Sequence, residues 1–505
     1  MSASNYTDTI AAIGTARGLG GIGIVRLSGP DSLSLLQRLF SRQSRLSQKA
    51  PAILPPTVDI LPQASADSSP LPQNIPTPFN FSPRKLEHGW LLDTAGRPLD
   101  EVMAVFMPGP HSFSGEDMAE IHCHGGRAVL DAVLEACLMA GARLAEAGEF
   151  TRRAFLNDRM DLSQAEAVAE MIAAPTLQGV FLARNKLEGR LGLDLEAARQ
   201  SLDWLRARLY LAIDFPDDAE DDPAPDAEFN SRLANLQGQF AALLQSFERA
   251  RIWREGALAV IAGRVNAGKS SLLNALLGRK RALVSATPGT TRDYIEESLN
   301  LDGLPLRLID TAGLRPAEQI EVDEVEAEGI ELAKDFFARA EAILLVLDAS
   351  TEPFASPPRL EDEEILRLYG PASGHSKVIV VLNKLDLLPE FAAPDELYGC
   401  PCCAISARDG QGLDRLTARL REFILPLGDG LDFSSQAAPN LRQAVKIRAV
   451  LRDLEELSRE YDGRIPAELL SVRLDSAAAH LADIMGSGDT EAVLDQVFSA
   501  FCIGK

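Results

Sequence analysis

The sequence has no long apolar run, no paired set of cysteines and no excess of positive charge. No stretch approaches the roughly 18 apolar residues that a membrane-spanning helix needs. The first residues, Met1–Ile10, are polar and do not show the basic-then-apolar pattern of a secretory signal. We therefore expect a cytoplasmic protein without a membrane span.

The cysteines and the charge narrow the class further. The six cysteines show no spacing typical of a disulfide framework, so reduced thiols are expected. The cluster Cys400-Pro401-Cys402-Cys403 lacks a second ligand pair at the spacing of a zinc site. The net charge of −23 argues against a non-specific nucleic-acid binder, which needs a cationic surface. It leaves room for a local basic patch, or for a partner that supplies one.

At 505 residues the chain is long enough for about three domains, and its pattern changes along its length. Residues 1–160 mix short β-like runs with one helical pattern near Arg127–Ala140, and leucines at helical spacing run from Leu187 to Leu209. We predict a multidomain α/β + α protein, with a Ras-like P-loop domain inserted into a discontinuous helical domain. The predicted segments are 1–160 for an N-terminal α+β domain with a flexible insertion at 43–83, 161–255 and 429–505 for the helical domain, and 256–428 for the P-loop domain.

A phosphate-binding motif opens the inserted segment. Gly263-Arg264-Val265-Asn266-Ala267-Gly268-Lys269-Ser270 has the spacing G-x4-G-K-S, between an apolar strand, Ala257–Ala262, and a helical stretch, Ser271–Leu277. In this context the N–H groups of the loop and the helix N-terminus surround phosphates. Lys269 would neutralise β- and γ-phosphate oxygens, and the Ser270 hydroxyl would ligate Mg²⁺.

A second phosphate motif, Asp310-Thr311-Ala312-Gly313, ends the predicted strand Leu304–Ile309. Its aspartate can hold the Mg²⁺ shell, and the Gly313 N–H can contact the γ-phosphate. A D-x-x-G sequence is weak by itself, but here it stands about 40 residues after the loop lysine and at a strand end, as in nucleotide hydrolases.

Two base-recognition motifs follow in the expected order. Asn383-Lys384-Leu385-Asp386 comes after the predicted strand Val378–Leu382, and a carboxylate there can accept the guanine N1–H and the exocyclic amine, which selects GTP over ATP. Ser406-Ala407 suits a loop whose N–H meets the guanine oxygen. The predicted GTP-binding residues are Asn266, Ala267, Gly268, Lys269, Ser270, Ser271, Asp310, Thr311, Ala312, Gly313, Asn383, Lys384, Asp386, Ser406 and Ala407.

The hydrolytic site lacks two parts of the Ras-type arrangement. Leu314 stands where a glutamine would orient the attacking water, and no arginine finger is evident. The Asn266 amide and the oxygen-rich run Ser285–Asp293 could hold a monovalent cation in place of the finger. For the water, several carboxylates stay open as alternatives, namely Glu321, Asp323, Glu324, Glu326 and Glu328.

These motifs and others make the chain resemble the family of tRNA-modification GTPases called MnmE or TrmE. The resemblance spans nearly the whole length. The segments that carry it are Asp8-Thr9-Ile10, Gly21–Gly29, Phe113–Asp117, His124-Gly125-Gly126, Gly148–Asn157, Asp214–Asp217 and the terminal Phe501–Lys505, joined to the inserted GTP-binding domain.

The resemblance implies a K⁺-activated GTPase in which the G domains of a homodimer meet. It implies that Thr291 joins Ser270 on Mg²⁺ and that Glu326 positions the water. Glu328 stays a second candidate, because the segment between Gly313 and Glu326 is longer here than in relatives. The residues that match the family's K⁺ ligands are Asn266, Ser285, Thr287 and Thr290.

The resemblance also implies that the N-terminal domain dimerises and binds a formyl- or methylene-tetrahydrofolate. Arg26, Glu120 and Lys505 match the family's folate contacts. Arg159 stands where the family often has lysine, and the two residues differ in hydrogen-bond geometry. Cys502 carries either an undefined thiol role beside the folate or no chemistry.

The function that the resemblance implies is a GTPase that acts with a flavoprotein partner, MnmG, in a heterotetramer or larger assembly with tRNA as substrate. The pair would attach an aminomethyl or carboxymethylaminomethyl group to carbon 5 of the wobble uridine in certain tRNAs. The alternative is a regulatory switch GTPase for ribosome assembly, which has no reason to keep a folate-like domain. A structural GTPase that remodels assemblies or membranes is a third alternative, and no basic amphipathic helix or lipid motif supports it.

Overall fold

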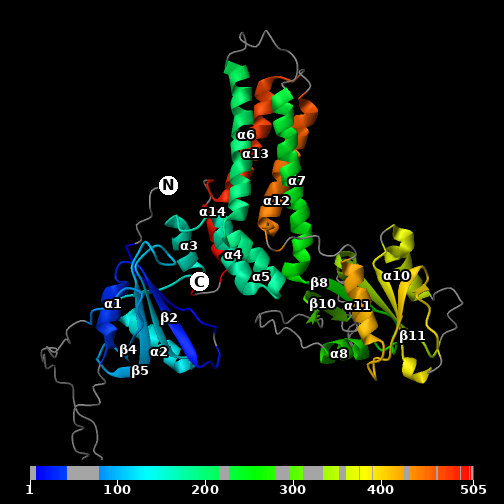
Figure 1. Ribbon diagram of the computed structural model, residues 1–505, viewed down its shortest axis with the longest axis horizontal. Helices are drawn as coiled ribbons and strands as arrows, with labels where there is room; N and C mark the ends of the chain where they lie inside the picture. The colour runs from blue at the N-terminus through cyan, green and yellow to red at the C-terminus, as the bar shows by residue number, and fades with distance from the viewer. Residues whose placement is uncertain are drawn as a thin grey trace, which may run out of the picture. The chain divides into compact units, whose positions relative to one another are not determined.

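The chain forms two compact units in a computed structural model (Figure 1). Unit 1 consists of Met1–Ala169 and Ala482–Lys505, and unit 2 of Glu170–Leu481. The structure describes residues 7–16, 18–42, 79–214, 227–279, 296–310, 334–351, 360–374, 376–388, 391–425, 433, 435–461, 465–488, 491–499, 501 and 504.

The sheet of unit 1 is built from strands in which apolar and polar side chains alternate, as expected for a sheet with two different faces. Neighbouring strands in this sheet pair antiparallel, except that β7 pairs parallel with β1. The strand order is β3-β4-β5-β6-β2-β1-β7. The bounds are β1 Ile10–Ile13, β2 Ile22–Ser28, β3 Phe40–Ser41, β4 Glu87–Leu92, β5 Pro98–Met107, β6 Met118–His124 and β7 Arg143–Leu144.

Helices cover both faces of this sheet unequally. The helices α1 (Ser32–Leu39) and α2 (Arg127–Met139) pack on one face, which forms the larger core (Figure 1). On the other face, Phe150 of α3 (Glu149–Leu156) packs against Ile10 and neighbouring apolar residues. The helix predicted near Arg127–Ala140 is thereby confirmed.

A helix near the C-terminus packs within unit 1. In α14 (Glu491–Ser499), Phe498 packs with Phe501 and with Leu162, which begins α4 (Leu162–Ala173). The segment 429–505 is predicted as the second part of the helical domain, and its last part contributes to this small core of unit 1.

The predicted insertion is shorter than expected at its end. Phe79 and Phe81 pack against Phe40, with ring centroids 5.2 and 5.0 Å from the Phe40 ring, and Phe81 is buried. Three phenylalanines bury enough apolar surface to order residues 79–83, although the surrounding composition is polar. The rest of the insertion, 43–78, lies outside the described residues.

Long helices form one part of unit 2. The leucines at helical spacing line the buried side of α6, with Leu191, Leu195 and Leu202 fully buried. The pattern is broken after Leu187, because Gly189 takes a left-handed φ of 83° between two helices. The bounds are α5 Leu177–Leu187, α6 Arg190–Asp214, α7 Ala227–Glu255, α12 Leu441–Glu460 and α13 Ala467–Met485.

The other part of unit 2 is a mostly parallel sheet of order β13-β14-β12-β11-β8-β10-β9. The inner strands are apolar on both faces because helices α8 and α11 cover one face and α10 covers the other. The bounds are β8 Ala257–Ala262, α8 Lys269–Arg279, β9 Glu296–Leu301, β10 Leu304–Asp310, β11 Ala342–Asp348, α10 Leu360–Tyr369, β12 Val378–Asn383, β13 Glu396–Leu397, β14 Cys400–Ala404 and α11 Leu413–Ile424.

The predicted fold class is confirmed: an N-terminal α+β part, long helices and an inserted α/β part occur in this order. The strands predicted at Ala257–Ala262, Leu304–Ile309 and Val378–Leu382 are present within a residue at each end. Within the described part of the chain, none of the helices combines the length and apolar character that crossing a bilayer requires.

Candidate nucleotide site and N-terminal polar site

The predicted nucleotide motifs meet at one edge of the parallel sheet of unit 2. Strands β10, β8, β11, β12 and β14 pair parallel in succession, so their carboxyl ends lie at the same edge. Asp310, Asn383 and Ser406 stand at or just after three of these ends, and the phosphate-binding loop follows β8. This edge is where open α/β sheets bind ligands.

The phosphate-binding loop is held in a conformation that requires its glycines. Gly263 has a φ of 132°, and a Cβ there would lie 2.2 Å from the Val346 carbonyl oxygen. Gly268 has a φ of 94°, and a Cβ would meet the Asn383 amide nitrogen at 2.1 Å. Asn266 takes a left-handed φ of 65° and is exposed. The loop backbone therefore lies directly on the strand ends.

The two polar side chains that begin α8 are already oriented. Lys269 is buried, and its Nζ donates to the carbonyls of Gly263 at 2.8 Å and Arg264 at 2.9 Å. The Ser270 hydroxyl donates to Asp310 Oδ2 at 2.8 Å. A hydroxyl and a carboxylate side by side are hard oxygen donors of the kind that Mg²⁺ prefers.

Asn383 connects the phosphate-binding loop to the base-recognition loop. Its amide donates to the Ala267 carbonyl at 2.9 Å and accepts from the Ala407 N–H at 3.0 Å. Asn383 is buried, so both bonds are sheltered from water. Asp386 accepts from the Ser406 hydroxyl at 2.9 Å, which fixes the carboxylate next to that loop.

Asp348, at the end of β11, is a site residue that the sequence reasoning missed. It accepts from Lys384 Nζ at 2.6 Å and from the Ser350 hydroxyl at 2.7 Å. Burial opposes its ionisation, but these bonds outweigh burial and hold the pKa of Asp348 below its usual range. The signal was its place at the carboxyl end of an apolar strand.

Several predicted site residues lie outside the described residues. They are Thr311, Ala312 and Gly313, the cation-loop residues Ser285, Thr287, Thr290 and Thr291, the carboxylates Glu326 and Glu328, and Cys502 and Lys505 at the end of the chain.

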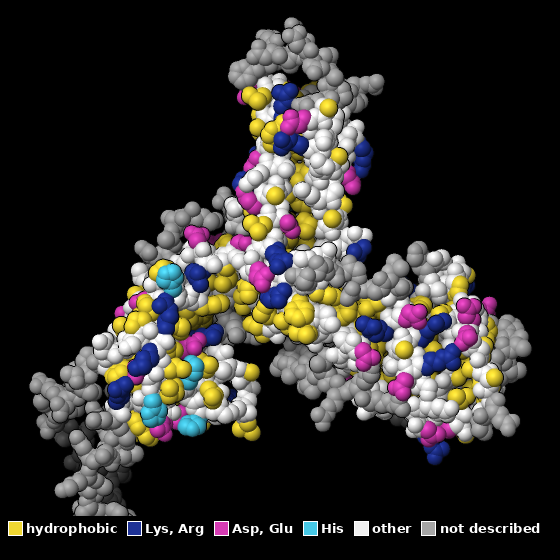
Figure 2. Space-filling view, viewed as in Figure 1, with side chains coloured by type: hydrophobic (Ala, Val, Ile, Leu, Met, Phe, Trp, Pro, Cys, Tyr) yellow, Lys and Arg dark blue, Asp and Glu magenta, His cyan; other side chains and the backbone are white. Residues whose placement is uncertain are grey.

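In unit 1, Arg26 and Glu120 lie on neighbouring strands and form an ion pair at 2.8 Å. The other carboxylate oxygen of Glu120 lies 3.2 Å from His122 Nε2. All three side chains are only partly buried, on the sheet face opposite α1 and α2. Figure 2 shows histidine and acidic side chains together on the surface of this unit.

The end of the chain reaches the same region. A Cβ on Gly504 would lie 2.2 Å from the carbonyl oxygen of Ile13, at the end of β1. A Cβ on the next residue, Gly14, would lie 3.1 Å from the Arg26 side chain. The Nε of Arg159 donates to the Ser112 carbonyl at 3.1 Å. The structure thus brings Arg26, Glu120 and the Gly504 backbone into one neighbourhood.

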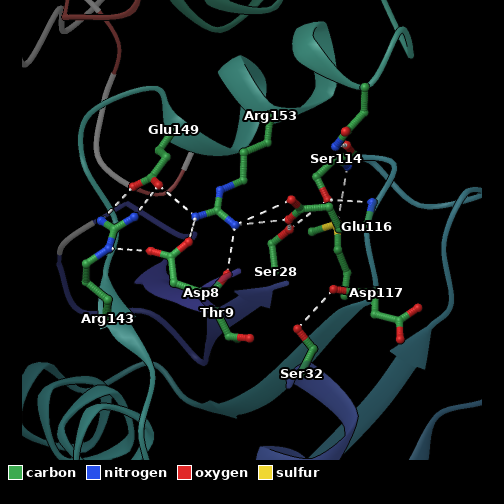
Figure 3. A network of polar contacts seen from close by, with 12 residues as sticks. Asp8, Thr9, Ser28, Ser32, Ser114, Glu116, Asp117, Arg143, Glu149 and Arg153 are labelled. Atoms are coloured by element: carbon green, nitrogen blue, oxygen red, sulfur yellow. Dashed lines mark hydrogen bonds and ion pairs between the residues drawn. The ribbon is translucent and has the colours of Figure 1, made fainter. Parts of the chain in front are cut away.

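Unit 1 also contains a buried arginine that holds a network of ion pairs. Arg153 of α3 is fully buried and pairs with Asp8 and Glu149 at 2.9 Å and with Glu116 at 3.2 Å (Figure 3). Arg143 bridges Asp8 and Glu149 from the other side. One guanidinium therefore joins three separate segments of the chain, and no local sequence pattern predicts this network.

The cysteines of β14 are buried among apolar side chains. Cys402 and Cys403 point to opposite faces of the sheet and belong to different apolar clusters. Burial raises the pKa of the Cys402 thiol to about 12, and it raises that of Cys403 as well. Among the residues that the structure describes, no group of three or more metal-ligating side chains occurs.

The chain is similar to known proteins over almost its whole length. It matches the family models described as GTP-binding protein TrmE N-terminus over residues 9–159 and MnmE helical domain over residues 162–502. It is 46% identical over 501 residues to the tRNA modification GTPase MnmE of Nitratidesulfovibrio vulgaris, covering 99% of this chain and 100% of that protein. The proteins of that name from Geobacter sulfurreducens and Lawsonia intracellularis are 39% and 38% identical, each with 99% of this chain covered and with 99% and 100% of their own lengths.

Proposed function

The chain belongs to the MnmE family of tRNA modification GTPases, and on this premise we propose that it uses GTP hydrolysis to drive modification of carbon 5 of the wobble uridine in certain tRNAs. The observation that carries the proposal is the meeting of the phosphate loop, Asp310, Asn383 and Asp386 at one sheet edge. We propose that the protein works in the cytoplasm as a homodimer, together with the flavoprotein MnmG.

For the nucleotide site, we propose that Lys269 neutralises the β- and γ-phosphates and that Asp386 accepts from guanine. Ser270 would ligate Mg²⁺ with Thr291, and Asp310 would hold the shell around the ion. Ser270 and Asp310 fit this role because their oxygens already lie 2.8 Å apart. Mg²⁺ supplies charge neutralisation for phosphoryl transfer. Glu326 is the proposed water-positioning residue, with Glu328 as the alternative.

The tRNA chemistry can be tested in cells. Transfer RNA from cells that lack the gene is expected to have lost its modified wobble uridines, as measured by mass spectrometry of digested nucleosides. Wild type should restore them and Lys269→Ala should not, because the alanine removes the cation that faces the phosphates. If the modified uridines persist without the gene, the ribosome-assembly switch becomes the function to test.

We further propose that K⁺ takes the place of the arginine finger, held by Asn266, Ser285, Thr287 and Thr290. The exposed, left-handed Asn266 in the phosphate loop supports this role. GTP turnover is expected to be faster in KCl than in NaCl or LiCl at equal ionic strength, because a fixed cation neutralises charge that develops on the phosphates. Asn266→Ala should remove the difference between the salts. Equal wild-type rates in all three salts would contradict the proposal.

For unit 1, we propose a formyl- or methylene-tetrahydrofolate site formed by Arg26, Glu120, Arg159 and Lys505, with a thiol role for Cys502. The Arg26–Glu120 pair supports it, since a carboxylate can accept from the N–H groups of a pterin and a guanidinium can bind a carboxylate of the ligand. The close contact of Gly504 with Ile13 and Gly14 supports a contribution of the end of the chain to this folate site.

Gly504→Ala tests whether the end of the chain belongs to that site. The φ of 94° and the Cβ contact at 2.2 Å should displace the tail. Such strain costs about 1–3 kcal/mol, or roughly 5- to 150-fold in affinity for 5-formyltetrahydrofolate by calorimetry. GTP turnover should be unchanged. Gly18→Ala is the control, because a Cβ there meets nothing within 4 Å. If Gly504→Ala binds the folate as tightly as wild type, the C-terminal tail does not contribute to the folate site.

A further inference from the structure

The phosphate-binding loop has an anchor that lies outside the nucleotide motifs. Arg264, the second residue of the loop, forms an ion pair at 2.6 Å with Asp362 of α10. The Asp362 side chain is only 4% exposed, and Arg264 is 24% exposed. A buried carboxylate is retained at such a place only where a specific partner compensates its charge.

The same arginine also holds the catalytic lysine through its main chain. Lys269 Nζ donates to the Arg264 carbonyl at 2.9 Å, beside its bond to the Gly263 carbonyl at 2.8 Å. The direction of the Lys269 ammonium therefore depends on where the Arg264 backbone lies. The Arg264 side chain, in turn, is fixed by Asp362.

The loop is anchored from three different elements. Gly263 rests against the Val346 carbonyl of β11, and Asn383 of β12 binds the Ala267 carbonyl. Both of these contacts come from strands in the core of the sheet. Asp362 differs, because it comes from a helix on the surface of the sheet and acts by charge.

We propose that Asp362 is a positioning residue of the GTPase site. Through Arg264 it holds the backbone of the phosphate-binding loop so that Lys269 points toward the β- and γ-phosphates. The inference rests on the GTPase activity and not on the identity of the modified nucleoside or the folate. It explains why the loop carries a long cation next to its first glycine.

The test measures kcat and KM for GTP, and Kd for GDP, in the full-length chain. Asp362→Asn is expected to lower kcat by about ten- to a hundredfold, because small misplacements of a catalytic group have effects of this size. The affinity for GDP should fall by less, since GDP keeps the β-phosphate contact of Lys269 but has no γ-phosphate whose transfer depends on exact placement. A role in folding alone would lower the thermal midpoint and leave kcat of the folded protein unchanged.

Two further variants make the test specific. Arg264→Gln should lower kcat to a similar extent, and the double variant should be no worse than either single one, because both act through one contact. Glu363→Gln removes an exposed charge from the same helix and should behave as wild type. Arg264→Lys keeps the charge but lacks the planar fork of arginine, so it should show an intermediate loss of kcat. This variant replaces Asp362→Asn as the test if Asp362→Asn does not fold.

Two results would overturn the proposal. One is a folded Asp362→Asn protein with kcat within about twofold of wild type, which is far below the loss expected from a misplaced catalytic group. The other is a double variant whose loss equals the product of the single losses. Absence of turnover in the wild-type protein, measured in the same assay, would count against the proposed function and not against this contact.

Discussion

Asp386→Asn is expected to weaken GTP binding by about two to four orders of magnitude and to improve binding of XTP. The carboxylate would accept two hydrogen bonds from guanine, and each bond to a charged group contributes about 1.5–3 kcal/mol. Together they account for about 3–6 kcal/mol, at 1.4 kcal/mol for each tenfold change. An asparagine amide has an NH2 donor group beside its oxygen acceptor, and the donor group suits the extra carbonyl of xanthine.

The measurement is a titration of the purified protein with fluorescent GDP and XDP analogues. The Ser406 hydroxyl that binds Asp386 at 2.9 Å can also bind the amide oxygen of asparagine, so the loop should keep its place. Asp395→Asn is the matched control, because this carboxylate is exposed and pairs with Arg415 in the same domain. A loss of less than about threefold in GDP affinity for Asp386→Asn would show that the carboxylate does not face the base, since one hydrogen bond alone exceeds that.

The nucleotide edge could be predicted because each of its parts follows a recognisable strand. Ala257–Ala262 and Val378–Leu382 are continuous apolar runs, and a buried parallel strand needs such a run. The residue directly after each run must lie at the sheet edge. Order along the chain and strand polarity therefore indicate that Lys269, Asp310 and Asn383 stand near the same edge.

Contacts between distant segments could not be predicted in the same way. Arg264 and Asp362 are separated by 98 residues, and nothing in the sequence of α10 distinguishes Asp362 from its acidic neighbours. The close contact of Gly504 with Ile13 joins residues near the two ends of the chain. Such pairings follow from tertiary packing, which local periodicity does not encode.

The buried network of unit 1 shows the same limit. In the sequence, Gly148–Asn157 stands out only by its family resemblance. Its arginines looked alike in the sequence, yet Arg153 is fully buried while the Arg152 side chain is 23% exposed. The difference arises because α3 presents one side to the sheet, where Arg153 pairs with Asp8 and Glu116 from two other segments.

The electrostatics of this network give its pH dependence a definite sign. Burial opposes ionisation of Asp8 and Glu149, but hydrogen bonds from Arg143 and Arg153 outweigh burial and hold the pKa of both carboxyls below their usual values. A carboxyl with a lowered folded-state pKa stabilises the fold above its unfolded-state pKa. Unit 1 should therefore lose stability as the pH falls below about 4.5, the ordinary value for a glutamate.

Arg153→Met is expected to destabilise unit 1 by about 3–5 kcal/mol at pH 7, because it leaves the carboxylates around a buried position without their shared cation. The unfolding free energy can be measured by urea titration, read with a fixed hydrogen-exchange pulse on peptides from β2 and β6. Arg127→Met is the control, since Arg127 is exposed and its pair with Asp131, at 3.7 Å, lies on the surface.

The pH series separates this electrostatic cause from a simple packing defect. Without Arg153, the carboxyls of Asp8 and Glu149 stay buried but lose part of the positive charge that offsets burial. Their folded-state pKa values therefore rise. The difference in unfolding free energy between wild type and Arg153→Met should then shrink as the pH falls from 7 to 3, because protonation removes the uncompensated charge in the variant and the ion pairs in wild type. A difference that stays constant over this range would mean that Arg153 supports unit 1 through its packing volume and not through its charge.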